Sequence, residues 1–270
     1  MNLHDTIAAV ALGVIEGITE FLPVSSTGHL QLAERWLTPQ SELFDIVVQC
    51  GAVLAVLFVF QRKLLGFAAT LHRTTTRNYL GKLFVAFALT SVGVLVAEKL
   101  KLKMEKDSVT AAAWAIRVAW ATLIGGVLFL AVEWWLRGKR GAEEITWAVA
   151  VAAGCAQILA ATYSGTSRSG ATILFALLLG VTRPAATEFS FLLGVPTLLA
   201  AGGYKLFKAW KHHQLSGEPW ATTLLATLAA AVVAFVVVKW LVRFVQTRTF
   251  VIFGWYRVAL AALIFALAGK

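Results

Sequence analysis

Two glutamates stand four residues apart near the start of a largely apolar chain. Glu16 and Glu20 interrupt the run Ile7–Phe21, and in a helix this spacing places both side chains on one face. Ionisable groups inside an apolar segment are costly and are usually functional. We therefore predict that the pair binds a metal ion or works as a general acid and base. A surface helix with one polar face is the alternative.

A cluster of hydroxyls and an imidazole follows, in the sequence Pro-Val-Ser-Ser-Thr-Gly-His that ends at His29. Ser25, Ser26 and Thr27 stand where a new helix would begin, so each of them could simply cap backbone N–H groups. Such a helix start also directs a partial positive charge at an anion. Because His29 comes three residues after Ser26, it can pair with this hydroxyl as in an activated nucleophile; a structural hydrogen bond is the alternative.

A second polar break, Tyr163–Gly170, supplies a cation. The residues of this break that could contact an anion are Gly165, Ser167, Arg168, Ser169 and Gly170. The guanidinium of Arg168 suits a phosphate group, because it can donate two parallel hydrogen bonds. The glycines would let backbone N–H groups approach the ligand. A structural ion pair between Arg168 and one of the two glutamates is the alternative.

The composition places these breaks in a membrane protein. The chain has 270 residues, of which 59% are hydrophobic and 14% are charged, whereas a soluble domain has about 25% charged residues. The net charge of +10 arises from short Lys and Arg clusters between apolar stretches, which is typical of membrane anchors and argues against nucleic-acid binding. The predicted crossing segments are Phe44–Phe60, Gly81–Ala97, Ala111–Leu136, Phe189–Gly203, Ala221–Val238 and Phe250–Ala268.

Two shorter apolar stretches, Ile7–Phe21 and Trp147–Thr162, each end at one of the polar breaks. The first would be roughly 22 Å long as a helix, which is less than the ~30 Å hydrocarbon core of a bilayer. We therefore predict two re-entrant helix hairpins, whose irregular tips must be satisfied by protein or water.

The two polar breaks and the segments after them resemble each other, which predicts an inverted repeat with a site between its halves. We expect pseudo-repeats at roughly residues 1–136 and 145–268 of a single membrane domain that spans residues 1–270. The predicted fold is an all-α polytopic membrane protein with about six transmembrane helices plus two re-entrant helix hairpins. The remaining charges near segment ends, among them Glu133 and Arg257, are expected to reach the bilayer surface or to form ion pairs.

The distribution of Lys and Arg gives a weak orientation. Twelve lie on the side that holds the segments Gln61–Lys82, Arg137–Glu144 and Lys239–Thr249 together with Arg183, against eight on the other side. The eight come from Lys99–Lys106, Lys205–Lys211 and Lys270. The excess favours the first side as cytoplasmic.

The two polar regions, Glu16–His29 and Tyr163–Pro196, closely resemble the signature regions of the bacterial undecaprenyl-pyrophosphate phosphatase family, which is linked to bacitracin resistance. The family's E-x-x-x-E motif matches the two glutamates, and its P-V-S-S-T-G-H motif matches Pro23–His29. Its P-G-x-S-R-S-G motif matches Ser164–Gly170, with Ser164 in place of the proline. This departure removes a rigid turn residue but keeps every polar group of the motif. The resemblance covers nearly the whole chain.

The resemblance implies a multi-pass phosphatase of the bacterial plasma (inner) membrane with its site facing the periplasm. Its substrate would be undecaprenyl pyrophosphate, whose terminal phosphate is removed to return the lipid carrier to cell-wall synthesis. A divalent cation, Mg²⁺ or Ca²⁺, would be required. The implied partners are this lipid and other membrane lipids, with no nucleic acid and with assembly as a homodimer.

Carried over residue by residue, the resemblance assigns roles to the motif positions. Ser26 would be the nucleophile, and His29 would activate it or protonate the leaving group. Glu16 and Glu20 would bind the metal, or one of them would act as a base. Arg168 would hold the transferred phosphoryl group. The phosphate-binding groups around it would be Ser25, Thr27, Gly165, Ser167, Ser169 and Gly170.

A transporter is the main alternative function. An inverted repeat with re-entrant tips and a buried arginine suits a membrane anion or lipid-phosphate transporter, or a flippase, that uses the same cavity. A carrier, however, has no need of a serine, a histidine and two carboxylates that together can activate a nucleophile.

Overall fold

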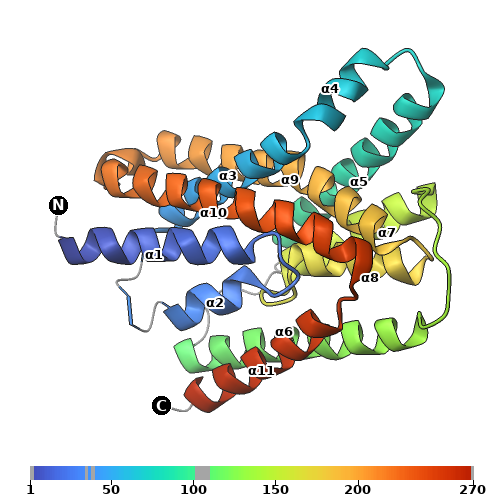
Figure 1. Cartoon of the computed structure of the whole chain (residues 1–270). Coiled ribbons are helices and arrows are strands. Elements are labelled where there is room, and N and C mark those ends of the chain that lie inside the picture. The colour runs from blue at the N-terminus through green and yellow to red at the C-terminus, as the bar shows by residue number, and fades with distance from the viewer. Residues whose placement is uncertain (1–2, 34–35, 38–39, 101–109, 269–270) are drawn as a thin grey trace.

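The structure is a computed structural model that describes residues 3–33, 36–37, 40–100 and 110–268. Within these residues the regular elements are helices joined by turns and loops, and the only β-type pairing is a single bridge between Ala142 and Val181 (Figure 1). The elements in chain order are α1 (Leu3–Thr19), α2 (Ser26–Ala33), α3 (Glu42–Val59), α4 (Gln61–Ala69), α5 (Thr74–Lys99), α6 (Ala111–Trp135), α7 (Trp147–Thr162), α8 (Arg168–Leu178), α9 (Arg183–Lys211), the 3-10 turn η1 (Gln214–Gly217), α10 (Trp220–Thr247) and α11 (Val251–Ala268).

The predicted polytopic membrane fold is confirmed. Helices α5, α6, α9, α10 and α11 are each long and apolar enough to cross a bilayer. A sixth span forms if α3 and α4 are taken together, although the chain bends by 63° between them. These six spans coincide with the six predicted crossing segments, of which two extend one residue beyond the helix, at Leu136 and at Phe250.

Both predicted helix–break–helix units are present. Helices α1 and α7 have 17 and 16 residues, fewer than the roughly 20 residues that a crossing needs. Helix α8 begins three residues before the apolar run Ala171–Val181, because the Ser167 hydroxyl accepts a hydrogen bond from the Gly170 N–H and caps the helix. Arg168 is therefore the first residue of a helix. That the two breaks stop inside the bilayer stays a prediction.

The helix contacts come in matching pairs. Helix α1 packs on α10 as α7 packs on α5, and α3 packs on α10 as α5 packs on α9. Helices α6 and α11 lie side by side at the bottom of Figure 1. Helix α1 begins, and α11 ends, at the left of this view. An exchange of residues 1–136 with 145–268 would produce this pairing, and the repeat with its inverted orientation remains our prediction.

Small residues bring α1 close to α10 and so fix the helix that carries the glutamates. A Cβ atom at Gly13 would lie 2.3 Å from the Ala226 carbonyl oxygen, and one at Gly17 would lie 2.6 Å from that of Ala230. Glycines four apart allow such backbone contact between membrane helices. Glu16 is thereby held in the protein interior.

Candidate active site

The two hairpin tips meet at Glu20. Its Oε2 accepts a hydrogen bond of 2.9 Å from the Ser26 hydroxyl, and its Oε1 accepts one of 3.2 Å from Nη2 of Arg168. Glu20 and Arg168 are 148 positions apart in the sequence. One carboxylate therefore joins the hydroxyl of the first tip to the guanidinium of the second.

The tips share an unusual backbone feature. Ser25 has a φ of 73° and Ser167 a φ of 70°, values that cost free energy in residues with a side chain. Each serine caps the helix that follows it: the Gly28 N–H donates to Ser25 Oγ at 3.4 Å, and the Gly170 N–H donates to Ser167 Oγ at 3.1 Å. The capping alternative thus describes Ser25. Ser167, for which no cap was predicted, caps its helix in the same way, so the two tips are built alike.

A cavity of about 590 Å³ opens beside this junction. Seven predicted site residues line it: Glu20, Ser25, Ser26, Thr27, Gly165, Ser167 and Arg168. Four others do not: Glu16, His29, Ser169 and Gly170. The Ser169 hydroxyl instead donates to the Leu22 carbonyl at 3.0 Å and ties the second tip to the first, while the Gly170 N–H is used by the cap. Neither residue is placed to contact a phosphate in the cavity.

Glu16 lies just beyond Glu20, with only 2% of its surface exposed. Neither of its carboxylate oxygens has a hydrogen bond of good distance and angle in the described part of the chain, and its polar neighbours are the side chains of Glu20, Asp45 and Gln49. A buried carboxylate without partners requires a cation or a proton, so these residues fit a divalent ion.

A metal at Glu16 would have few protein ligands. Among the described residues no group of three or more His, Cys, Asp or Glu is close enough to hold an ion. Mg²⁺ is commonly bound by one or two carboxylates, with phosphate oxygens and water completing its shell. Both oxygens of Glu20 already accept hydrogen bonds, which leaves Glu16 as the better ligand.

Two of the three guanidinium nitrogen atoms of Arg168 have no hydrogen-bond partner among the described residues. Its Nη2 contacts Glu20, whereas its buried Nε and Nη1 atoms have no partner among the described residues. Its Cζ lies 5.5 Å from the ring centre of Phe21, which holds the guanidinium from one side. Arg168 lines the cavity, and two of its nitrogen atoms still lack partners, so its guanidinium is suited to bind a phosphate there.

Gly194 of α9 makes room for this guanidinium, since a Cβ there would lie 2.1 Å from Nη1 of Arg168. We expect Gly194→Ala to displace Arg168 and to lower kcat about 10²-fold, the usual effect of a 1 Å misplacement in an active site. Steady-state phosphate release measures this. Gly203→Ala on the same helix meets open space and should retain normal turnover; equal activity of the two variants would contradict the assignment.

His29 is placed differently from the prediction. Its Nδ1 lies 2.8 Å from the Ser25 carbonyl oxygen, so this nitrogen is the donor, and its Nε2 lies 2.7 Å from the Tyr256 hydroxyl. The imidazole and phenol rings are stacked, with centres 5.5 Å apart. The Ser26–His29 pairing that the spacing permits is therefore not formed. His29 instead fixes the carbonyl next to Ser26.

We expect Tyr256 to affect catalysis by orienting His29 through the hydrogen bond between them. We expect Tyr256→Phe to lower kcat about fivefold, the effect of losing one hydrogen bond of ~1 kcal/mol. Initial rates of phosphate release would show this. Tyr204→Phe removes a tyrosine hydroxyl from a residue that lines the cavity and serves as the control. A Tyr256→Phe rate equal to that of the control would mean that the orientation of His29 does not depend on the phenol.

Comparison with known proteins agrees with these motifs. A family model described as bacitracin resistance protein BacA matches residues 9–263. This chain belongs to that family. Within the BacA family, a protein of Rhizobium etli (strain CIAT 652) named undecaprenyl-diphosphatase is 45% identical over 265 residues, which are 98% of this chain and 97% of the relative. A protein of the same name from Xylella fastidiosa (strain Temecula1) is 41% identical over 97% of this chain and 98% of its own.

Two functional candidates in this BacA-family chain were missed by sequence reasoning alone. Gln157 of α7 lines the cavity, is 2% exposed and has no partner for its amide among the described residues. Arg257 was expected to reach the bilayer surface or to form an ion pair, yet it is fully buried beside both tips and donates to backbone carbonyls. Gln157 is the only large polar residue of α7, and this isolation was a usable signal. Arg257 gave none, because its helix face depends on tertiary packing.

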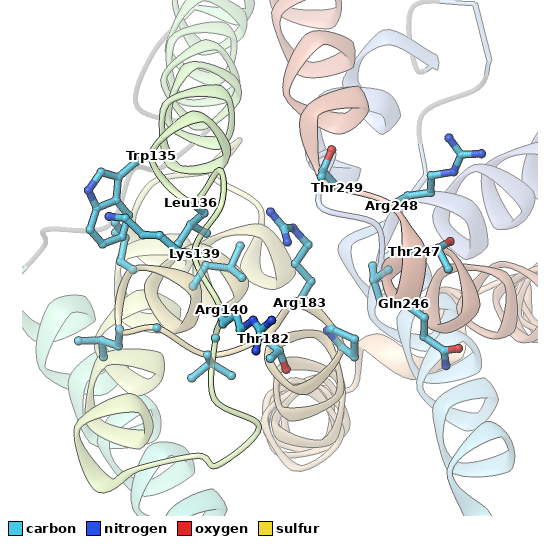
Figure 2. A pocket seen from close by; sticks show the side chains of 18 residues that line it. Trp135, Leu136, Lys139, Arg140, Thr182, Arg183, Gln246, Thr247, Arg248 and Thr249 are labelled. Carbon is cyan, nitrogen blue, oxygen red and sulfur yellow. The ribbon is translucent and has the colours of Figure 1, made fainter.

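A second cavity, of about 490 Å³, lies at the other end of α9. Its residue Arg183 and Thr197 of the first cavity are 14 positions apart in that helix, or about 21 Å. Figure 2 shows Arg183 between Lys139 and Thr249, with Arg140 next to Thr182. The lining contains four cations and no carboxylate, and Arg183 is already paired with Glu133. This cavity therefore lacks the groups that could activate a nucleophile.

Proposed function

We propose that the chain is an undecaprenyl-pyrophosphate phosphatase, which hydrolyses the terminal phosphate of undecaprenyl pyrophosphate to give undecaprenyl phosphate. The product is the lipid carrier that cell-wall synthesis uses again. Identities of 41–45% to relatives named undecaprenyl-diphosphatase support this substrate. The observation that carries the proposal is the Ser26–Glu20–Arg168 contact at the cavity wall. No observation favours a transporter.

The geometry supports a two-step displacement. Ser26 Oγ attacks the terminal phosphorus while its proton passes to Glu20, which is within hydrogen-bond distance. The bond between that phosphorus and the bridging oxygen breaks, and undecaprenyl phosphate leaves. Water then attacks the phosphorus of the phosphoserine. The bond between that phosphorus and Ser26 Oγ breaks as Glu20 returns its proton to Oγ, and inorganic phosphate is released. Arg168 holds the phosphoryl oxygens through its unpartnered N–H groups. Protonation of the leaving oxygen by His29 remains an assignment from the sequence.

A divalent cation, Mg²⁺ or Ca²⁺, belongs to the same proposal. Glu16 would be its main protein ligand, with Glu20 beside it. The bound ion would supply positive charge that stabilises the pyrophosphate and its leaving group.

We place the protein in the bacterial plasma (inner) membrane with the active site open to the periplasm. The four cations of the second cavity lie at the opposite end of α9 from the active site, as an excess of basic residues on the cytoplasmic side requires. The eight Lys and Arg counted on the periplasmic side include those of residues 101–106 and Lys270, which lie outside the described residues. Assembly as a homodimer is part of the proposal and can be tested by the mass of the purified protein in detergent.

Phosphate release in detergent tests the function, because a transporter has no gradient or compartment there. Purified protein is given undecaprenyl pyrophosphate with excess Mg²⁺ or with a chelator, beside Arg168→Ala. We expect release from the wild type with Mg²⁺, and none with the chelator or with the variant. Release that persists with the chelator would remove the metal from the proposal. Folded wild type that releases no phosphate with either Mg²⁺ or Ca²⁺ would reject the phosphatase.

A further inference from the structure

Arg257 of α11 is a fully buried arginine whose described partners are all backbone carbonyls. Its Nε donates to Thr122 at 3.2 Å, its Nη1 to Pro23 at 3.3 Å, and its Nη2 to Ala121, Gly165 and Thr166 at 3.3, 3.2 and 3.1 Å. One of these carbonyls belongs to the first hairpin tip, two belong to the second, and two belong to α6. A single guanidinium therefore connects both walls of the site to the helix pair behind them.

The contact with Thr166 also sets the direction of a backbone donor. The peptide between Thr166 and Ser167 is trans, as are all peptides that the structure describes, so its C=O and N–H groups point in opposite directions. Because the carbonyl points to Arg257, the Ser167 N–H points away from it. Ser167 lines the cavity, whereas Arg257 does not.

This N–H is available, whereas its neighbours are not. The Val24 N–H, next to the Pro23 carbonyl, donates to Leu22 at 2.8 Å, and the Thr166 N–H, next to the Gly165 carbonyl, donates to Tyr163 at 3.2 Å. The Ser167 N–H has no acceptor in the described part of the chain. An N–H group without an acceptor, on a half-buried residue that lines a cavity, is suited to bind an anionic oxygen.

We propose that Arg257 is a positioning residue for the phosphatase reaction, which fixes the separation of the two hairpin tips and turns the Ser167 N–H toward the phosphoryl group. The inference rests on the proposed function. A guanidinium bound to the carbonyl of a peptide also polarises that peptide, which strengthens its N–H as a donor. The ligand of the N–H is a non-bridging oxygen of the terminal phosphate, where charge changes during transfer.

Gly125 of α6 allows the guanidinium to be moved without removing it. A Cβ at this position would lie 2.2 Å from Nη2 of Arg257 and 2.7 Å from its Cζ. Gly125→Ala therefore keeps the charge and the chain of Arg257 but displaces the atoms that hold the second tip. Gly254→Ala is the matched control, because it perturbs the same α6–α11 contact through the side chain of Leu130, 2.9 Å away, and leaves the guanidinium alone.

The test measures kcat and KM for undecaprenyl pyrophosphate, together with thermal stability in detergent so that rates refer to folded protein. We expect Gly125→Ala to lower kcat at least tenfold with KM within about threefold of wild type, because removal of one such donor costs about 10²–10³-fold. Arg257→Lys, which keeps the charge but loses the planar fork, should give the same pattern. Gly254→Ala should keep the wild-type kcat even if its stability falls.

The outcomes separate this inference from the function on which it rests. Wild type without activity rejects both. Active wild type with normal kcat in Gly125→Ala and Arg257→Lys rejects the role of Arg257 alone. A loss in Gly254→Ala as large as in Gly125→Ala would also reject it, because general loosening of the α6–α11 contact would then explain the effect.

Discussion

Replacing Arg168 with lysine should lower kcat by about 10³-fold or more, as loss of the arginine that stabilises a transferred phosphoryl group does. The lysine ammonium is a point charge that cannot bind two phosphoryl oxygens and Glu20 together. The Ser26–Glu20 contact remains, so binding of the lipid should change far less than kcat. Phosphate release at saturating substrate measures the effect.

Arg183→Lys is the matched control for this substitution. Arg183 begins α9 as Arg168 begins α8, and each arginine is paired with a buried glutamate. Because Arg183 lies at the other cavity, its replacement should leave kcat near that of the wild type. An Arg168→Lys enzyme that works as well as Arg183→Lys would contradict the assignment of Arg168 to the phosphoryl group.

Replacing Ser26 with alanine should also lower kcat by about 10³-fold or more, since loss of a nucleophile removes the covalent route and leaves only residual catalysis. Rapid acid quenching of the wild type with labelled substrate should trap phosphate on Ser26, and the variant should trap none. We expect Ser26 to be the group that is phosphorylated, because its 2.9 Å hydrogen bond to Glu20 places a base next to the hydroxyl.

Ser91→Ala is the control for Ser26. This serine lines the same cavity, but its hydroxyl donates to Phe87 within its own helix, so its loss should leave kcat unchanged. Loss of a nucleophile leaves far less than a tenth of the wild-type rate. If Ser26→Ala keeps more than about a tenth of that rate, then water and not Ser26 attacks the phosphorus.

Much of the fold follows from local sequence properties. The lengths of apolar runs located the crossing helices, and the polar breaks located both hairpins, because a bilayer penalises every interruption of an apolar helix. The apolar run after the second break begins at Ala171, three residues after the first residue of α8. The positive φ of Ser167, which permits the cap, depends on contacts of the tip with other helices and has no local signal.

The residues that form the site were partly predictable, but the hydrogen bonds between them were not. Glu20, Ser26 and Arg168 were identified from residue types that are expensive to bury in a membrane. The partner of Ser26 was not, because helical spacing favoured His29, whereas the turn between α1 and α2 brings Glu20 to the hydroxyl. Arg257 was misjudged for a similar reason: sequence gives its depth along α11 but not which face of α11 packs against α6.

The central claim is that the two hairpin tips form one catalytic site, and a double-mutant cycle tests it most directly. Phosphate release is measured under single-turnover conditions for Ser26→Ala, Arg168→Lys and the double variant. Residues that act as a unit give losses that do not multiply, so the double variant should lose about as much as the worse single variant, or about 10³-fold. Losses that multiply to about 10⁶-fold would show that Ser26 and Arg168 act independently, and the account of a shared site would be wrong.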